Sequence, residues 1–76
     1  MSEGNELKTL YGILGFGRAG HATDQRTGNP IGHSTATDST TSYYRTSGKY
    51  VGYARRMSGA IRLYLPGGRE VAAYRE

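Results

Sequence analysis

The sequence predicts an all-β protein made of four β-hairpin repeats of about 20 residues, in a pseudo-fourfold or small barrel-like arrangement. The chain of 76 residues contains 12 glycines and 7 tyrosines, and it has no alanine-rich or leucine-rich helical stretch. Tyrosine and threonine favour strands, whereas glycine favours tight turns. Glycine also recurs at a fixed interval, because Gly28, Gly48 and Gly68 are 20 residues apart.

The repeat is visible in three segments that align without gaps. They are DQRTGNPIGHS from Asp24, YRTSGKYVGYA from Tyr44 and YLPGGREVAAY from Tyr64. In each segment a β-branched residue follows the shared glycine three positions later, and glycine or alanine comes next. A three-residue hairpin loop places glycine in the left-handed region, where it avoids a Cβ clash. We therefore expect each shared glycine at the tip of a hairpin.

The first repeat is degenerate and is carried by YGILGFGRAGHA, residues 11–22. Its glycines also spell G-x-G-x-x-G, the pattern of a dinucleotide-binding turn. Such a turn needs a helix directly after the glycines, but the next residues, HATDQRTGNPIG, lack helical periodicity and contain a proline. We therefore interpret Gly17 as a hairpin-loop glycine and expect no cofactor. The pattern leaves open which of Leu10, Tyr11, Ile13 and Leu14 point toward the core, and we expect Tyr11 and Ile13 to do so.

The limits of the domain follow from polarity. Residues 1–8 are polar, so we expect a disordered or frayed N-terminus and a single domain over residues 9–76. The chain has no cysteine, so neither disulfides nor a thiolate zinc site can support so small a core. No apolar run approaches the roughly 20 residues of a membrane span, and MSEGNELKTL does not resemble a signal peptide, which favours a cytoplasmic protein.

Alternation along the strands assigns each residue to one of two faces. An uninterrupted register around Gly48 puts Tyr43 opposite Val51, and the aliphatic members of the equivalent set mark the buried face. The predicted buried residues are Thr23, Ile31, Thr41, Tyr43, Val51, Tyr53, Ile61, Leu63, Val71 and Ala73. The predicted opposite face carries Ser42, Tyr44, Tyr50, Gly52, Ala54, Arg62, Tyr64, Glu70, Ala72 and Tyr74.

The recurring pattern Tyr-x-x-x-Gly-[Lys/Arg]-x-Val-[Gly/Ala] resembles the bacterial four-fold β-flower proteins, which are small uncharacterised proteins of four β-hairpin repeats. The resemblance covers roughly residues 11–76 and implies no catalytic residue. A looser likeness is to the YD repeats of large bacterial surface and toxin shells. Arg45 or Leu65 stands where those repeats have aspartate.

Positive charge is concentrated in the second half of the chain. Residues 41–76 carry seven bases and two acids, net +5, whereas residues 1–40 carry three bases and four acids, net −1. The same half contains six of the tyrosines, several of them on the face opposite the aliphatic one. We expect this half to bind an acidic or nucleic-acid partner. The expected binding residues are Tyr44, Tyr50, Tyr64, Tyr74, Arg45, Lys49, Arg62 and Arg69.

Three interpretations of these residues remain open. Single-stranded nucleic acid stacks its bases on aromatic rings and meets cations with its phosphates. Tyrosine and arginine are also enriched at protein interfaces. The third interpretation gives the tyrosines no role beyond forming strands and the cations none beyond solubility. Our leading hypothesis is protein–protein contact, including self-association, because a small cysteine-free core gains from burying a tyrosine face. Nucleic-acid binding is the alternative.

We expect neither a catalytic nor a metal site. His21 and His33 are predicted to be cross-strand neighbours, but zinc takes about four ligands and alternation puts Asp24 on the other face. No Gly-x-Ser-x-Gly elbow or other nucleophile motif occurs. The sequence therefore predicts a non-catalytic binding module of a bacterial or phage-type cytoplasm, possessing no cofactor, membrane partner or small-molecule substrate.

Overall fold

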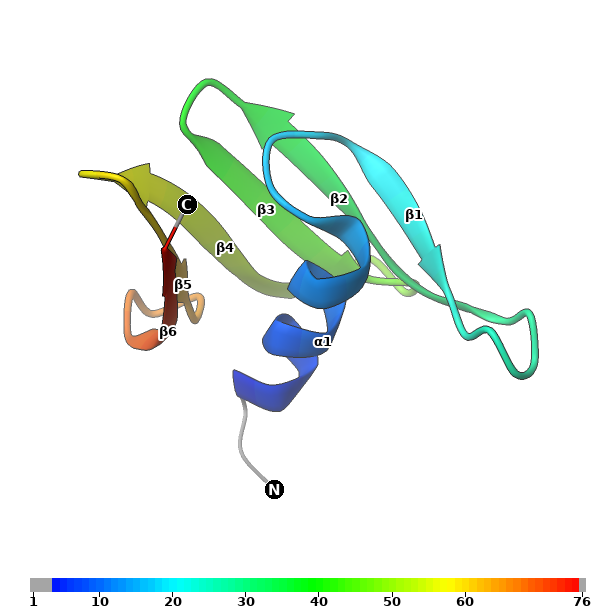
Figure 1. Cartoon of the computed structure of the whole chain (residues 1–76). Helices are drawn as coiled ribbons and strands as arrows, with labels where there is room; N and C mark the ends of the chain where they lie inside the picture. The colour runs from blue at the N-terminus through cyan, green and yellow to red at the C-terminus, as the bar shows by residue number, and fades with distance from the viewer. Residues whose placement is uncertain (1–3, 76) are drawn as a thin grey trace.

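The computed structural model describes residues 4–75, which form one helix followed by a six-stranded antiparallel sheet (Figure 1). The elements are α1 (Gly4–Leu14), β1 (Gly20–Thr23), β2 (Pro30–Thr37), β3 (Thr40–Arg45), β4 (Tyr50–Met57), β5 (Ala60–Tyr64) and β6 (Glu70–Arg75). Each strand pairs with the next one, so the sheet is a meander. We call the sheet face that packs against α1 the inner face and the opposite face the outer face.

The prediction of a mostly β, hairpin-rich protein is confirmed, but the sheet is open. Its strand order is β1-β2-β3-β4-β5-β6, so β1 and β6 are edges that do not pair with each other. The pseudo-fourfold or barrel-like arrangement is therefore not confirmed. Among the described residues, no helix combines the length and the apolarity that crossing a membrane would require.

The shared glycines lie in hairpin loops. Gly28, Gly48 and Gly68 have φ values of 76°, 94° and 94° between β1 and β2, β3 and β4, and β5 and β6. The Gly48 N–H donates to the carbonyl of Arg45, and the Gly68 N–H donates to that of Leu65, both at 2.8 Å. Left-handed backbone at these positions is the reason that glycine recurs there.

The first repeat is a helix and a loop, not a hairpin. Tyr11 and Ile13, expected in a strand, belong to α1, and Ile13 is exposed. Residues 4–8, expected to be frayed, form the first turns of this helix, whereas residues 1–3 lie outside the described part. The buried residues of α1 include three leucines at positions 7, 10 and 14. Their spacing is the apolar stripe of an amphipathic helix, which the polar appearance of the segment concealed.

Hydrogen bonds hold the loop after α1 against the inner face. Gly17 has φ 86° and lies in this loop rather than at a hairpin tip. Its N–H donates to Thr41 Oγ1 at 2.8 Å. The Tyr43 hydroxyl donates to the carbonyl of Gly15, and Ser34 Oγ donates to that of Arg18. A strand begins at Gly20, where a dinucleotide-binding turn would need a helix.

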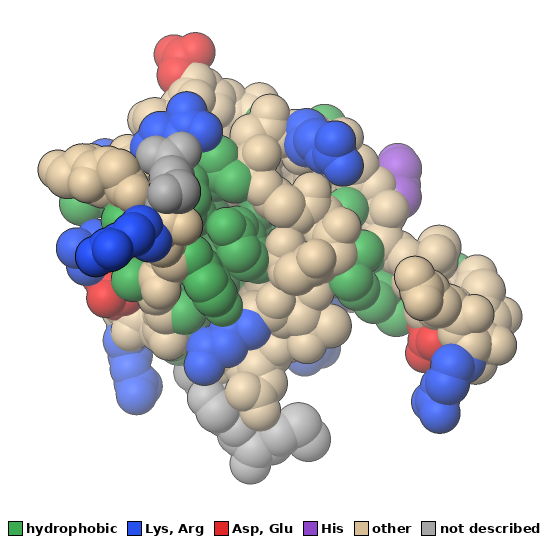
Figure 2. Space-filling model, viewed as in Figure 1, with side chains coloured by type: hydrophobic (Ala, Val, Ile, Leu, Met, Phe, Trp, Pro, Cys, Tyr) green, Lys and Arg blue, Asp and Glu red, His purple; other side chains and the backbone are tan. Residues whose placement is uncertain are grey.

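The hydrophobic core lies between α1 and the inner face, and Figure 2 shows apolar side chains gathered in the middle of the molecule. A Cβ added at Gly32 would lie 2.8 Å from Leu10 Cδ2, and one added at Gly52 would lie 2.8 Å from Leu7 Cδ2. The small residue of the repeat therefore lets the helix approach the sheet closely. The buried cluster consists of Leu7, Leu10, Leu14, Ala22, Tyr43, Val51, Ala54, Ile61 and Leu63.

β-Bulges correct the predicted division into two faces. In the β3–β4 pair, Tyr44 is opposite Tyr50 but Tyr43 is opposite Gly52, so Val51 is the extra residue. The register beyond the bulge is shifted by one residue. Gly52 and Ala54 consequently face inward and Tyr53 faces outward, which reverses the prediction for all three.

The same irregularity occurs in the other two glycine-tipped hairpins, at Ile31 and at Val71. Both of these residues are half-buried and pack against the core. In β6 the shift turns Ala72 inward and leaves Ala73 exposed, again reversing the prediction. Thr23, predicted to be buried, is exposed because the β1–β2 loop has four residues, with Asp24 N–H donating to the carbonyl of Asn29. Thr23 is consequently opposite Pro30 and has the outward position that Tyr44 has in the β3–β4 hairpin.

Candidate functional site

Aromatic side chains cross the outer face from β1 to β5. We call them the aromatic ladder, and they are His21, His33, Tyr44, Tyr50, Tyr53 and Tyr64. Cross-strand pairing puts these residues next to one another, since the antiparallel register aligns each with an aromatic residue of the neighbouring strand. The predicted pairing of His21 with His33 is confirmed.

Two ring pairs of the ladder are stacked, and the pairs His21–His33 and Tyr44–Tyr50 are tilted, with interplanar angles of 44° and 43°. The ring centroids of His33 and Tyr44 are 5.2 Å apart with an interplanar angle of 13°, and those of Tyr53 and Tyr64 are 5.1 Å apart at 21°. Each ring of a stacked pair covers one face of its partner. The Tyr64 hydroxyl donates to Met57 Sδ at 3.9 Å, so this side chain leans along the sheet.

The ladder is half-exposed. His21 and Tyr50 are exposed, and the other members are of intermediate exposure. Burial against its neighbours raises the pKa of the Tyr50 hydroxyl above its ordinary value. Since α1 packs on the inner face, no element of the described chain covers the ladder.

Three arginines lie beside the ladder on the outer face of β4, β5 and β6, and we call Arg55, Arg62 and Arg75 the arginine cluster. Arg55 is directly opposite Arg62, and Arg75 is opposite Ala60, one row further along the strands. Arg62 Nη1 donates to Glu70 Oε1 at 2.9 Å. Within the described residues, Arg55 and Arg75 form no ion pair.

The electrostatics of the arginine cluster favour an anion. Glu70 compensates the charge of Arg62, so Arg55, which is directly opposite Arg62 and forms no ion pair within the described residues, is the cation left for an anion between them. The Nε atom of Arg62 is buried and lacks a hydrogen-bond partner in the described part of the chain. The hydrogen bond with Glu70 raises the pKa of Arg62 above its ordinary value.

Four of the predicted binding residues meet on the outer face: Tyr44, Tyr50, Tyr64 and Arg62. Tyr74 does not join them, because the bulge in β6 turns it inward. It is opposite Ile61 and stacks on Tyr11 of α1, with centroids 4.9 Å apart.

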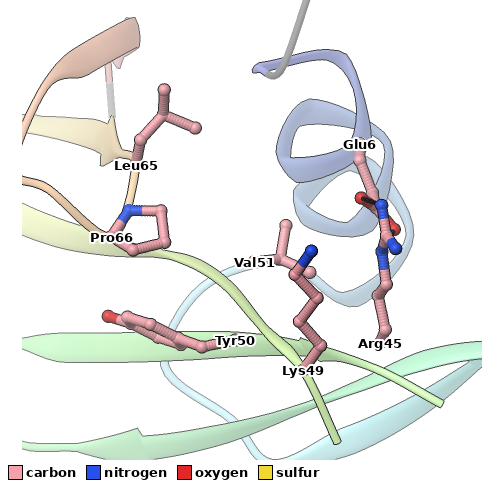
Figure 3. A pocket seen from close by; sticks show the side chains of 7 residues that line it. All are labelled: Glu6, Arg45, Lys49, Tyr50, Val51, Leu65 and Pro66. Carbon is pink, nitrogen blue, oxygen red and sulfur yellow. Dashed lines mark hydrogen bonds and ion pairs between the residues drawn. The ribbon is translucent and has the colours of Figure 1, made fainter. Parts of the chain in front are cut away.

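The remaining predicted cations lie at the hairpin tips. Arg45 Nε and Nη2 bind the two carboxylate oxygens of Glu6, at 2.6 and 2.7 Å (Figure 3). Lys49 lines a pocket next to this pair (Figure 3). Arg69 occupies the equivalent position in the β5–β6 hairpin, where its carbonyl accepts a hydrogen bond from Leu65. None of the three belongs to the arginine cluster.

Sequence reasoning missed several members of the site. His21 and His33 were placed side by side but given no binding role, and Tyr53 was assigned to the wrong face. A usable signal was the small size of Gly52 and Ala54, because small residues at alternate positions are typical of a face that another element approaches closely.

Metal binding finds little support at the ladder. In the described segment no three His, Cys, Asp or Glu side chains come together as a metal-binding group. The pair His21 and His33 falls short of the roughly four ligands that zinc takes. The chemistry of this face is therefore that of hydroxyls, ring edges and guanidinium groups.

Comparison with known proteins identifies no relative, since no family model, curated protein or solved structure matches the chain. The likeness to four-fold β-flower proteins and YD repeats stays a prediction. The function has to be argued from the outer face and its chemistry.

Proposed function

We propose that this protein is a non-catalytic binding module that holds an acidic segment of a partner protein on the outer face of its sheet. The observation that carries the proposal is the aromatic ladder and the adjacent arginine cluster on a face that the described chain leaves uncovered. Tyrosine and arginine are the residues that dominate protein interfaces. Rings already held by stacking also lose little conformational entropy when a partner binds.

Charge selects the kind of partner. The chain carries a net charge of +4, and Arg55 faces Arg62 without an ion pair of its own among the described residues. A partner with Asp or Glu side chains would give Arg55 an ion pair. A second copy of the chain would bring the same excess of positive charge. An acidic partner is therefore favoured over self-association.

Nucleic-acid binding is the second candidate, and the arginine cluster supports it because phosphates suit guanidinium groups. The stacking geometry argues for protein instead. Bases bind to the free faces of aromatic rings, and stacking leaves His33, Tyr44, Tyr53 and Tyr64 at most one free face each. Ring edges and tyrosine hydroxyls, by contrast, suit the amide groups and side chains of a peptide.

Fluorescence anisotropy with two labelled probes tests the proposal. One probe is a peptide of repeated Glu-Gly-Phe units, and the other is a mixed-sequence single-stranded oligonucleotide. We expect the peptide to bind more tightly than the oligonucleotide. Arg55→Gln should weaken peptide binding about fivefold by removing an unpaired cation. Arg26→Gln is the matched control, because it removes an exposed arginine in the loop between β1 and β2, outside the arginine cluster.

The other hypotheses predict different results. Tight oligonucleotide binding that falls steeply with salt, with no peptide binding, would replace the proposal by nucleic-acid recognition. A sedimentation mass well above 8.3 kDa that Tyr64→Ser reduces would replace it by self-association. Equal effects of Arg55→Gln and Arg26→Gln on the peptide would show that net charge, and not the outer face, is responsible.

A further inference from the structure

A pocket of about 280 Å³ lies at the end of the sheet, between α1 and the tips of the β3–β4 and β5–β6 hairpins (Figure 3). Its apolar lining comes from Val51, Leu65 and Pro66. Val51 and Leu65 are only 7% and 8% exposed, and Val51 belongs to the core cluster, so this part of the lining is continuous with the hydrophobic core. Tyr50 supplies an aromatic wall.

Three charged residues also line the pocket, but two of them neutralise each other. Arg45 binds both carboxylate oxygens of Glu6, which uses the fork of its guanidinium. Lys49 has no ion pair within the described residues. In the part of the chain that the structure describes, Lys49 is therefore the uncompensated positive charge of a pocket whose lining also includes Val51, Leu65 and Pro66.

We propose that this pocket binds a small organic anion that has one carboxylate and an apolar body of a few carbon atoms. The carboxylate pairs with Lys49, and the body packs on Val51, Leu65 and Pro66. A single free cation matches a single negative charge, and the nearby Glu6 carboxylate disfavours a second one. A volume of about 280 Å³ is at the small end for ligand pockets, which limits the size of the body.

This inference goes beyond the proposed function and does not depend on it. Of the residues that line the pocket, Tyr50 alone belongs to the aromatic ladder, and none belongs to the arginine cluster. The two sites can therefore be lost separately. Arg55→Gln should leave anion binding in the pocket unchanged even though it weakens peptide binding to the outer face.

A titration of the ¹⁵N-labelled full chain with hexanoate, followed by amide chemical shifts, tests the pocket. We expect saturable shifts at millimolar hexanoate, centred on Val51 and Leu65, and no saturable shift with the uncharged hexanamide. Lys49→Gln should weaken hexanoate binding about tenfold, as expected for losing a charge-assisted hydrogen bond. Arg69→Gln is the matched control, because Arg69 follows the shared glycine of the next hairpin as Lys49 does but does not line the pocket.

A second variant adds positive charge to the pocket where Lys49→Gln removes it. Glu6→Gln leaves the Arg45 guanidinium without its carboxylate partner, so the pocket gains a second free cation. We expect this variant to bind the dianion adipate about tenfold more tightly than the unaltered chain does. The proposal is overturned if hexanoate gives no saturable shift, if hexanamide binds equally well, or if Lys49→Gln and Arg69→Gln behave alike. Unchanged adipate binding in Glu6→Gln would also contradict it.

Discussion

The two faces of the sheet are formed by the same repeat, but they carry side chains of different kinds. On the inner face, the repeat supplies glycines on which helical leucines rest, with Leu10 over Gly32 and Leu7 over Gly52. On the outer face, it supplies aromatic rings that stack across strands, such as Tyr53 and Tyr64. The inner face is closed by α1, whereas no described element covers the outer face. The difference shows how one short repeat can supply small residues to one face of a sheet and aromatic residues to the other.

The β-bulge after each shared glycine determines which residues lie on the inner face and which on the outer face. At Val51 the bulge adds one residue, so the residues that follow it change faces. Without this shift, Tyr53 would meet α1, and Ala54 would replace an aromatic ring on the outer face. Steric fit explains the outcome, because α1 approaches so closely that only small side chains fit beneath Leu7.

The largest effect on the free energy of unfolding is expected from placing a carboxylate at Ala54, in comparison with the adjacent Tyr53. Ala54→Glu places a carboxylate on the inner face, where Ala54 is 0% exposed and belongs to the core cluster. An unpaired buried charge costs about 3–5 kcal/mol, which is most of the stability of a small domain. Tyr53→Glu removes one stacked ring and should cost about 1 kcal/mol. Urea denaturation followed by circular dichroism measures both free energies of unfolding.

Which of the two variants loses more stability shows whether β4 has the bulge at Val51. A folded Ala54→Glu variant together with an unfolded Tyr53→Glu variant would mean that β4 continues past Val51 without a bulge. That result would also remove Tyr53 from the aromatic ladder.

A smaller effect tests how closely the helix approaches the sheet at Gly52. Gly52→Ala brings a Cβ to 2.5 Å from the Tyr64 carbonyl oxygen and 2.8 Å from Leu7 Cδ2, at a φ of 156° that itself disfavours a side chain. Such overpacking costs about 1–3 kcal/mol. Gly12→Ala is the control, because an added Cβ there meets nothing within 4 Å and the position lies in α1. This variant should gain up to about 1 kcal/mol from helix propensity. We expect the midpoints of thermal unfolding of the two variants to shift in opposite directions. Equal shifts would contradict the packing of Leu7 against Gly52.

The hairpins could be predicted from the sequence because turn chemistry is local. The left-handed backbone at Gly28, Gly48 and Gly68 requires glycine at each turn, and their regular spacing reveals the repeat. The bulges could not be predicted in the same way. Whether Val51 is an extra residue depends on what packs on the sheet, and the packing partner is a distant segment.

The helix was missed for a related reason. Residues 4–14 contain glycine and polar residues, so composition favours a loop, but Leu7, Leu10 and Leu14 share one face of a helix. The candidate site was predicted in part. Strand alternation near a hairpin tip was enough to predict the positions of Tyr44, Tyr50, Tyr64 and Arg62. Tyr74 and Arg45 contact α1, which the sequence did not predict.

The smallest effect concerns the buried tyrosine of the inner face. Tyr43→Phe removes the hydroxyl that donates to the carbonyl of Gly15, which should cost about 1 kcal/mol. Burial raises the pKa of Tyr43 well above its usual value, so the folded protein keeps this hydroxyl protonated after the unfolded chain has lost the proton. The stabilisation is therefore complete below the unfolded pKa of about 10 and is lost as pH rises above it, at about 1.4 kcal/mol per pH unit.

Urea midpoints across this alkaline range check the pH dependence. The free energy of unfolding of the unaltered chain should fall more steeply with pH than that of Tyr43→Phe, because the phenylalanine variant lacks one titrating group. Parallel curves would show that Tyr43 ionises freely in the folded protein and is not part of the closed inner face.

The most direct test of the division into two faces is a ¹³C-edited NOESY spectrum of the full chain. The assignment predicts cross-peaks from the Ala54 methyl group to core side chains such as Leu63, and from the Tyr53 ring to the Tyr64 ring. The contrary result is a Tyr53 ring with cross-peaks to the leucines of α1 and an Ala54 methyl group with none. That pattern would show that the sheet has no bulge at Val51 and that the outer face does not carry the aromatic ladder.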